Sequence, residues 1–497
     1  MILTIPAEIY SGESVRRIDH NAINDAGISG YTLMTRAAQA SLDAALAQFP
    51  DTNRWQVVCG AGNNAGDAYV LARLASQKGV EVSVLSLVDP DNLGGDAATA
   101  YQDFVAAGGA VGNWSGVLDA TADLLVDGIV GSGLQRDIEG RFAEAVNAMN
   151  EHAAAVLALD LPTGIGTDDG AIMGAAIRAS LTVTFVGLKP GLFLGDGPDC
   201  IGKLAFADLD IPQECRASVP VEMRRISESI VARSLPPRSR AAHKGDFGRL
   251  LIVGGGPGMP GAVVLAGSAA LRSGAGLVTV ATHPSHHAEV VVGRPELMCQ
   301  GIGKVDELDA LLESAEVIAI GPGLGTDKWA RSLFDQLGRK NVPMVIDADA
   351  LNLLSESPTR MDNRILTPHP GEAARLLSVS TAEVQADRRL AVTTLRQKYG
   401  GTVVLKGAGT LVSSATGPLW LCTGGNPGMA APGMGDVLTG IISGLLAQGL
   451  DPEMAAVVGV AVHAAAGDSA ALAGQRGLMA TDLLQELRSW VNPAPAR

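Results

Sequence analysis

Acidic and amide side chains follow short apolar runs in the first part of the chain. The segment Gly62-Asn-Asn-Ala-Gly-Asp67 follows one Val-rich run, and Asp127 and Asp160 each end another. Because the carboxyl ends of parallel strands meet at one edge of a sheet, we expect these side chains and Thr163 to line a single crevice. Oxygen ligands of this kind suit a hard cation or a sugar.

A glycine-rich run near the C-terminus has the residue types that phosphate chemistry needs. Gly433-Met-Gly435-Asp436 opens an apolar run with helical spacing. The free N–H groups at a helix start can hold a developing phosphate charge, and Asp436 can accept a proton from an attacking hydroxyl. The sequence has no Gly-x-x-x-x-Gly-Lys-Ser/Thr motif, so this chemistry is not of the P-loop kind.

A dinucleotide-binding loop is the alternative for the first part of the chain. Gly60, Gly62 and Ala65 match Gly-x-Gly-x-x-Gly/Ala, and Asp89 follows the next apolar run near the offset of a ribose-binding acid. This match keeps an NAD-dependent dehydrogenase open. Asp67 argues against it, because we expect Asp67 in the first helical turn, where it would repel a pyrophosphate.

Two further patterns in the second part are weaker. Gly256, Gly258 and Gly261 match the same fingerprint, but no acid follows the next apolar run, and two prolines remove N–H groups from the loop. The histidines at 283, 286 and 287 share a loop that lacks the acid pattern of a metal site.

Short Val/Ile/Leu runs alternate with Ala/Leu-rich helical stretches along the chain, which is the pattern of βαβ units around a parallel sheet. The sequence therefore predicts an α/β protein. We expect buried strands at residues 56–59, 81–88, 123–126, 155–159, 181–186, 249–253, 277–281, 317–320, 344–346, 364–366 and 402–405.

The proline-rich segment from Asp210 to Asp246 separates these two sets of strands. We predict a first domain over residues 1–213, a linker over 214–235 and a second domain over 236–497. A chain of 497 residues is long enough for two or three domains.

Composition narrows the class of partners. The net charge of −15 disfavours a binder of nucleic-acid backbones or anionic membranes. The cysteines are widely spaced and odd in number, which indicates a reducing compartment rather than disulfides or a zinc knuckle. The start lacks a signal-peptide pattern, and His463 and Asp468 interrupt the apolar stretch 455–473, so we expect a cytoplasmic protein.

Read together and in order, these motifs resemble the family of bifunctional NAD(P)H-hydrate repair enzymes over nearly the whole chain. The signals are Gly62-Asn-Asn-Ala-Gly-Asp67, Asp127-Gly-Ile-Val-Gly-Ser-Gly133, Asp160-Leu-Pro-Thr163-Gly164, His243-Lys-Gly-Asp246, Gly321-Pro-Gly-Leu-Gly325, Asp347-Ala-Asp-Ala-Leu-Asn352, Thr367-Pro-His-Pro-Gly-Glu372, Lys406-Gly-Ala-Gly-Thr410 and Gly433-Met-Gly-Asp436. The resemblance implies an N-terminal Rossmann-like three-layer αβα epimerase domain followed by a ribokinase-like α/β dehydratase domain.

The resemblance also implies the reactions. The first domain interconverts the R and S forms of hydrated NADH and NADPH. The second dehydrates the S form while ADP, its co-substrate, becomes AMP and phosphate. Potassium in the epimerase site and magnesium are implied as cofactors, with small molecules as partners and a homo-oligomeric state.

The site residues that the resemblance implies fall into five groups. Asp160 and Asp436 are the catalytic residues. The epimerase substrate site comprises Asn63, Asn64, Ala65, Gly66, Asp67, Gly131, Ser132, Gly133, Leu134, Gln135, Arg136, Asp137 and Asp160. The dehydratase substrate site comprises Ala262, Gly323, His369 and Asp436. Lys406, Gly407, Ala408, Gly409, Thr410 and Gly435 bind the nucleotide. Asn64, Asp127 and Thr163 bind potassium.

The sequence departs from the family pattern in two places. Ala65 and Ala68 stand where the family usually has glycine, and an added methyl there would narrow the pocket or strain a backbone at positive φ. Ala431-Pro432 replaces the usual Ser/Thr-Gly before Gly433 and removes a hydroxyl and an N–H from the loop.

Besides the NAD-dependent dehydrogenase, two alternatives to repair remain. One is a ribokinase-like small-molecule kinase for a vitamin precursor, with a non-catalytic N-terminal binding domain. The other is a nucleotide-binding or scaffold protein whose first domain is catalytically silent.

Overall fold

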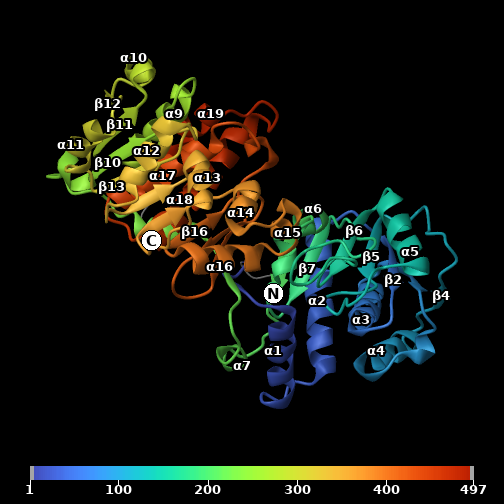
Figure 1. Ribbon diagram of the computed structural model, residues 1–497. Helices are drawn as coiled ribbons and strands as arrows, with labels where there is room; N and C mark the ends of the chain where they lie inside the picture. Colours follow the sequence, from blue (N-terminus) through green and yellow to red (C-terminus); the bar gives the residue numbers. More distant parts are fainter. Residues whose placement is uncertain (1–4, 493–497) are drawn as a thin grey trace. The chain divides into compact units, whose positions relative to one another are not determined.

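The computed structural model describes residues 5–492 and confirms the α/β class (Figure 1). The chain divides into two compact units, Met1–Arg224 and Arg225–Arg497. This division falls inside the segment that the sequence predicts as the connection, which contains the short helices α7 (Glu214–Ala217) and α8 (Glu228–Ser234).

The first unit is built on a parallel sheet with the strand order β4-β3-β2-β5-β6-β7-β8. Its strands are β2 (Arg54–Cys59), β3 (Glu81–Ser86), β4 (Val111–Asn113), β5 (Leu124–Gly128), β6 (Ala155–Leu159), β7 (Leu181–Phe185) and β8 (Lys203–Ala207). The longer helices are α1 (Gly12–Asn24), α2 (Gly30–Gln48), α3 (Asn63–Gln77), α4 (Gly95–Ala106) and α5 (Gly140–Glu151), and α6 (Gly197–Cys200) is one turn. The short strands β1 (Glu8–Ile9) and β9 (Met223–Arg225) pair antiparallel.

Apolar side chains on both faces of the sheet explain its three layers. Val57 and Val126 pack with α1 to α4 on one face, whereas the adjacent strand residues Val58 and Leu125 pack with α5 on the other. The expectation that every strand is buried on both faces is wrong for β3, whose first three residues are exposed or half-buried. The sequence analysis missed β4 and β8 because neither has a long apolar run.

The strand order reverses between β2 and β5, so the loops after these two strands open a crevice at the carboxyl edge of the sheet. Helix α3 starts at Asn63, directly after this turn. Asp67 is therefore in the second turn of the helix, and the expectation that it lies in the first turn is wrong. The helix starts earlier because Gly62, in an extended conformation, is its N-cap residue.

In the second unit the strands lie in the order β18-β17-β16-β15-β14-β13-β10-β11-β12. The strands β10 to β16 are parallel, and β17 and β18 are antiparallel additions at one end. Their bounds are β10 (Arg249–Val253), β11 (Leu277–Thr282), β12 (Met298–Gly301), β13 (Val317–Ile320), β14 (Met344–Ile346), β15 (Arg364–Leu366), β16 (Thr402–Leu405), β17 (Thr410–Ser413) and β18 (Leu419–Cys422). The sequence reasoning missed β12, β17 and β18.

The helices of the second unit include a pair, α9 and α17, that packs on the sheet. The helices are α9 (Pro260–Ser273), α10 (His287–Gly293), α11 (Asp309–Leu312), α12 (Lys328–Leu337), α13 (Ala348–Glu356), α14 (Pro370–Leu377), α15 (Thr381–Ala386), α16 (Arg388–Tyr399), α17 (Met434–Ala447), α18 (Pro452–Ala470) and α19 (Ala480–Trp490). Within residues 5–492, one helical segment, Pro452–Ala473, is long and apolar enough to cross a membrane. In this fold α18 contributes to the core with α9, α17 and α19.

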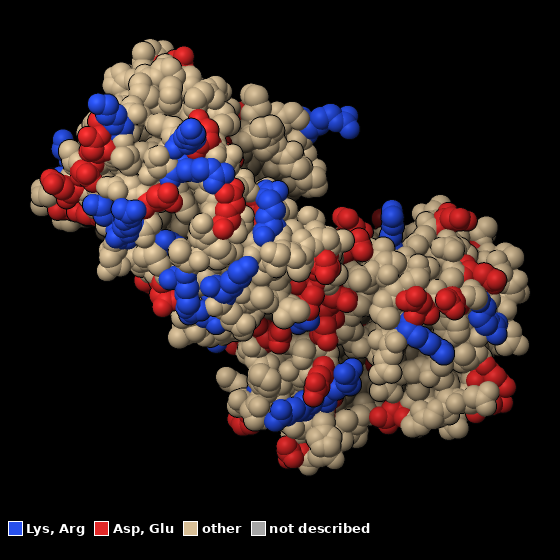
Figure 2. Space-filling model, in the orientation of Figure 1, with Lys and Arg blue, Asp and Glu red and all other residues tan. Residues whose placement is uncertain are grey.

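Charged side chains of both signs are interspersed over the surface that Figure 2 shows. Because the chain carries 52 acidic against 37 basic side chains, any anion site has to be built from local groups rather than from the overall charge.

Gly440 sets the distance between α9 and α17. A Cβ on Gly440 would lie 2.1 Å from the carbonyl oxygen of Ala266, whereas a Cβ on Gly261 would meet nothing within 4 Å. We expect Gly440→Ala to destabilise the second unit by about 1–3 kcal/mol through overpacking. Gly261→Ala, on the exposed first turn of α9, is the matched control and should not destabilise. Urea unfolding checks both, and equal stability of the two variants would contradict the packing argument.

Candidate functional sites

A buried ion pair forms the centre of the second unit's site. Asp347 follows β14, and its Oδ1 lies 2.7 Å from Nζ of Lys406, which follows β16. The Oδ2 atom accepts a hydrogen bond from Thr439 at 2.7 Å. Glu372 of α14 places Oε2 3.8 Å from the same ammonium. The site therefore has more buried carboxylates than ammonium groups, which favours a further cation.

Helix α17 begins directly at this ion pair. Gly433 is its N-cap residue with φ +85°, a conformation that favours glycine, and it has no capping side chain among the described residues. A Cβ on Gly435 would lie 3.3 Å from Nζ of Lys406. The first-turn N–H groups are therefore available to an anion beside Lys406.

Asp436, in the first turn of α17, is suited to accept a proton. Burial raises its pKa to about 7, the charges of Asp347 and Asp349 add to the rise, and Lys406 opposes it. A carboxyl group with a pKa near neutrality exchanges protons at physiological pH.

His369 belongs to the start of α14, and its ring is half-exposed. Its Nδ1 accepts hydrogen bonds from the N–H groups of Gly371 and Glu372 at 3.0 and 3.3 Å. Glu372 returns the contact by accepting from the His369 N–H at 2.7 Å. Burial, Lys406 and Arg375 lower the pKa of His369, so the neutral ring is favoured and Nε2 carries its proton. That N–H is a donor at the edge of the site.

The glycine loops after β10 and β13 pack against each other at the point where the strand order reverses. The N–H of Gly256 donates to the carbonyl oxygen of Gly323 at 2.7 Å. A Cβ on Gly323 would lie 3.0 Å from Cβ of Ala262, and one on Gly321 would overlap the backbone of Asp347. The structure thus joins Ala262 and Gly323 to the Asp347 side of the site.

The loop that the sequence assigns to nucleotide follows β16. Gly407 and Gly409 have positive φ, and Gly407 and Ala408 are exposed, so the backbone of the loop is accessible. The buried guanidinium of Arg388 donates to the carbonyl oxygens of Leu405, Lys406 and Gly409, each at 3.3 Å. Arg388, which the sequence analysis missed, holds this loop in place.

In the first unit, Asp127 and Thr163 form a fully buried polar pair. Asp127 accepts hydrogen bonds from the Thr163 hydroxyl at 2.7 Å and from its N–H at 2.8 Å. The amide of Asn64, oriented to suit its neighbours, donates to the Leu159 carbonyl and accepts from the Gly131 N–H. Burial raises the pKa of Asp127 to about 6, although the hydrogen bonds from Thr163 and Ile129 act to lower it. No basic side chain within residues 5–492 forms a salt bridge with Asp127.

Asp160 lies at the end of β6 with φ +68°, an unusual conformation for a residue with a side chain. Its carboxylate forms an ion pair with Lys189, a fully buried residue. Oδ2 accepts a hydrogen bond from the Ser132 N–H at 3.3 Å. A Cβ on Gly131 would lie 3.3 Å from Cβ of Asp160 and 3.1 Å from the side-chain amide of Asn64, so one crevice holds all three.

The predicted loop from Gly131 to Asp137 is only partly joined to this crevice. Gly131 and Ser132 contact the Asn64 and Asp160 side. Gln135, Arg136 and Asp137 are exposed, and no contact joins them to the crevice within the described residues.

The two alanines that replace family glycines fit without strain. Ala65 and Ala68 are fully buried inside α3, and neither has positive φ. The Ala68 methyl fills space that a side chain at Gly128 would otherwise occupy, because a Cβ on Gly128 would lie 2.3 Å from it. The expectation of backbone strain at these two positions is therefore wrong, because both alanines lie in helix α3. In the second unit, Ala431 is half-buried and Pro432 exposed, and Gly433 still begins α17.

Several sequence signals lie outside both sites. Asp89 accepts a hydrogen bond from Asp91 and caps a short turn, as structural aspartates do. His283 and His286 bond to Ser285 and Gly258, and the described residues contain no cluster of three or more metal-ligating side chains. The His243 to Asp246 motif precedes β10, at the opposite end of that strand from the site.

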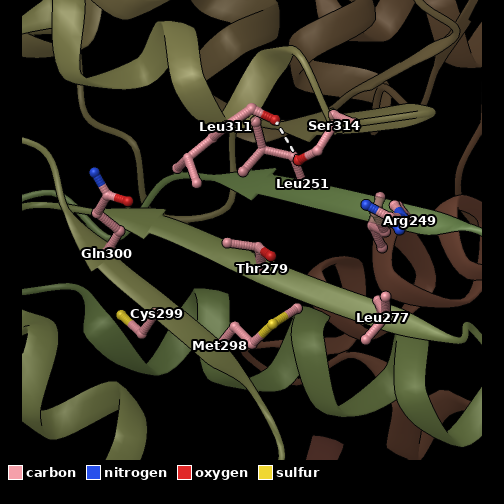
Figure 3. Close-up of a pocket in the computed structure, with 11 residues that line it drawn as sticks. Arg249, Leu251, Leu277, Thr279, Met298, Cys299, Gln300, Leu311 and Ser314 are labelled. Atoms are coloured by element: carbon pink, nitrogen blue, oxygen red, sulfur yellow. Dashed lines mark hydrogen bonds between the residues drawn. The ribbon is translucent and has the colours of Figure 1, made fainter.

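Two open cavities also lie away from the chemistry. One, of about 350 Å³, is lined by strand residues such as Leu277, Thr279 and Gln300 of β11 and β12 (Figure 3). Another, of about 600 Å³, is lined by β3 and the ends of α3 and α4. Neither contains a residue that the sequence assigns to a site.

The sequence analysis missed three polar residues beside the sites. Lys189 follows β7 by four residues, so the strand-end rule that found Asp127 and Asp160 could have found it. Arg388 and Thr439 lie in helices that carry no motif, and only the tertiary contacts show them.

Both units of the chain match family models of known proteins. Residues 30–191 match the family model described as YjeF-related protein N-terminus, and residues 250–489 match the NAD(P)H-hydrate dehydratase model. A ribokinase-like superfamily protein from Enterococcus faecalis is structurally similar, with a TM-score of 0.50 and 33% identity. The match covers 54% of this chain and 95% of that protein.

Similarity to two relatives spans the full chain. Both are called bifunctional NAD(P)H-hydrate repair enzyme Nnr. The one from Coxiella burnetii is 44% identical, covering 98% of this chain and 99% of the relative. The one from Escherichia coli is 42% identical, and the match covers 99% of this chain and 95% of the relative. The chain belongs to the family of bifunctional NAD(P)H-hydrate repair enzymes.

Proposed function

We propose that this protein repairs hydrated NADH and NADPH in two steps. The first unit interconverts the R and S hydrates, and the second dehydrates the S form as ADP becomes AMP and phosphate. The observation that carries this proposal is that each unit has its own strand-end site with a buried aspartate beside a lysine. The kinase alternative uses only the second of these sites.

The first step needs proton transfer and no redox chemistry. The hydrate carries its hydroxyl on the carbon next to the ring nitrogen, so loss of water gives an iminium-like species that water can re-enter from the other face. Asp160 lies beside Ser132 and Asn64 in the crevice and is the group that we assign to exchange this proton. The start of α3, from Asn63 to Asp67, and the loop from Gly131 to Asp137 orient the substrate.

Potassium fits the groups around Asp127. A buried carboxylate without a basic partner in the described chain, a hydroxyl at Thr163 and an amide oxygen at Asn64 are hard oxygen ligands. A bound cation there supplies fixed positive charge to the crevice.

The second step makes hydroxide a better leaving group. Asp436 accepts the proton of the substrate hydroxyl as that oxygen attacks the terminal phosphate of ADP, and the transferred phosphate then leaves with the oxygen. Lys406 and the first-turn N–H groups of α17 stabilise the developing phosphate charge. His369, Ala262 and Gly323 bind the hydrate, and the loop from Lys406 to Thr410 binds the nucleotide.

Magnesium also fits this site. The carboxylates of Asp347, Glu372 and Asp436 outnumber the ammonium of Lys406. They do not form a metal-ligating cluster by themselves within the described residues, but their negative charge favours a divalent cation that arrives with the nucleotide phosphates. Such a cation supplies charge neutralisation at the phosphates.

We expect Asp436→Asn to lower dehydration by about 10²–10⁴-fold, because the amide cannot accept the hydroxyl proton. Recovery of absorbance at 340 nm from NADH hydrate with ADP and magnesium measures it. Interconversion of the epimers, followed without ADP, is the internal control and should be unchanged. Full recovery by the variant would contradict the role of Asp436, and no nucleotide-dependent recovery by the wild type would favour the kinase.

The pH dependence of dehydration follows from the same residue. Only the carboxylate of Asp436 can accept a proton, so kcat/KM for the S hydrate should fall as the pH drops through about 7. A pH series of initial rates on the free enzyme checks this. A profile that stays flat down to pH 5 would contradict the assignment.

Asp160→Asn should remove epimerisation and leave dehydration intact, which is the reverse of the Asp436→Asn variant. With a mixture of epimers, we expect the variant to recover only the S fraction rapidly, because the first unit no longer supplies S from R. Absorbance at 340 nm over time measures the two phases. Rapid recovery of the whole mixture, beyond the spontaneous rate, would show that Asp160 is not needed.

A further inference from the structure

Lys189 lies at the base of the first unit's crevice, and its ammonium is fully engaged. It contacts Oδ1 of Asp160 and donates to the Thr184 hydroxyl at 3.0 Å and the Phe185 carbonyl at 2.9 Å. An ammonium has three N–H bonds, so these contacts use all of them. Lys189 is 1% exposed, so no water screens the ion pair from its side.

The two oxygens of Asp160 are held very differently. Oδ1 accepts from Lys189, from the Thr184 hydroxyl at 3.3 Å and from the Phe185 N–H at 3.4 Å. Oδ2 accepts a hydrogen bond from the Ser132 N–H at 3.3 Å on the crevice loop, and the Ser132 side chain also stabilises the carboxylate. The carboxylate is thus anchored through Oδ1, while Oδ2 keeps the greater capacity to accept a proton.

Other carboxyl groups compete for the same positive charge. Asp19 of α1 and Asp67 of α3 interact electrostatically with Lys189 and Asp160, but neither forms a salt bridge with Lys189 in the described chain. Burial raises the pKa of Asp19 to about 6, and burial with the charges of Asp160 and Asp19 raises the pKa of Asp67 well above its usual range. Burial alone would also raise the pKa of Asp160, but Lys189 and Ser132 outweigh it and hold that pKa low.

We propose that Lys189 is a positioning residue of the epimerase site, which selects Asp160 as the ionised carboxyl group and directs Oδ2 to the substrate. This inference rests on the proposed epimerase function. It deepens that function by naming the residue that sets both the charge and the orientation of the group exchanging the proton.

Atoms and protons are conserved in the proposed epimerisation step. The ionised carboxylate of Asp160 first takes up a proton from solvent on Oδ2. When the hydroxyl leaves, this proton passes to it, the C–O bond breaks and water forms. When water adds to the opposite face, its C–O bond forms and the proton returns to Oδ2. Lys189 keeps its own protons throughout, because of the two Asp160 oxygens it contacts only Oδ1, which does not exchange the proton.

The test compares Lys189→Met, which removes the charge, with Lys189→Arg, which keeps it. Epimer interconversion is followed by chromatography of NADH hydrate without ADP, over a range of pH. Lys189→Met should lower kcat by about tenfold or more, and the pH midpoint that reports Asp160 should rise by roughly 1–3 units, because a neighbouring cation lowers a carboxyl pKa by that amount. Lys189→Arg should keep the midpoint near that of the wild type.

The controls separate positioning from folding. Lys203→Met removes an exposed lysine of the same unit, which contacts Gln48, and should leave both kcat and the midpoint unchanged. Thr184→Val removes one donor from Oδ1 but keeps the ammonium, so its effect on the midpoint should be smaller than that of Lys189→Met. Dehydration of the S hydrate with ADP reports the integrity of the second unit in every variant.

Each outcome of this test either supports or refutes the positioning role of Lys189. A raised midpoint in Lys189→Met with a midpoint kept in Lys189→Arg supports the proposal. Equal midpoints in the wild type and Lys189→Met, or equal loss of kcat in both variants without a shift, would overturn it and leave Lys189 a structural residue. If the wild type itself does not interconvert the epimers, the proposed function and this inference both fail, whereas activity with unshifted variants refutes this inference alone.

Discussion

The chemistry of this protein depends on one constraint, which is that a carboxylate buried at the end of a parallel strand needs a positive partner. Asp347 pairs with Lys406 in the second unit, and Asp160 pairs with Lys189 in the first. Removing one partner from such a pair costs about 3–5 kcal/mol, because the remaining charge is left in a medium of low polarity. The surrounding loops therefore hold these side chains in fixed positions.

The arrangement of strands explains why both pairs can form. In each sheet the order reverses once, between β2 and β5 in the first unit and between β10 and β13 in the second. Loops diverge at that point and leave space at the carboxyl edge. Glycines line the space where backbones approach closely, as at Gly321 against Asp347, and helices α3 and α17 begin beside it.

The carboxyl groups of each site have different environments, and this difference suits acid–base chemistry. Asp436 has a pKa of about 7 because burial and neighbouring carboxylates outweigh Lys406, which contacts Asp347 directly. Asp160 is held ionised, whereas the pKa of Asp67 is raised. In the first unit one lysine decides which carboxyl group carries the negative charge, and this gives chemically similar side chains distinct roles.

The sequence by itself determined the α/β class, most buried strands, the strand-end residues Asp127 and Asp160 and the helix-start residue Asp436, because apolar periodicity and glycine loops are local signals. It also carried the family resemblance, which depends on the order of the motifs. It did not determine the start of α3, the partners Lys189, Arg388 and Thr439, or the fit of Ala65 and Ala68. These depend on which segments meet in space, and a contact between residues far apart in the chain has no local signature, so only the tertiary structure decided them.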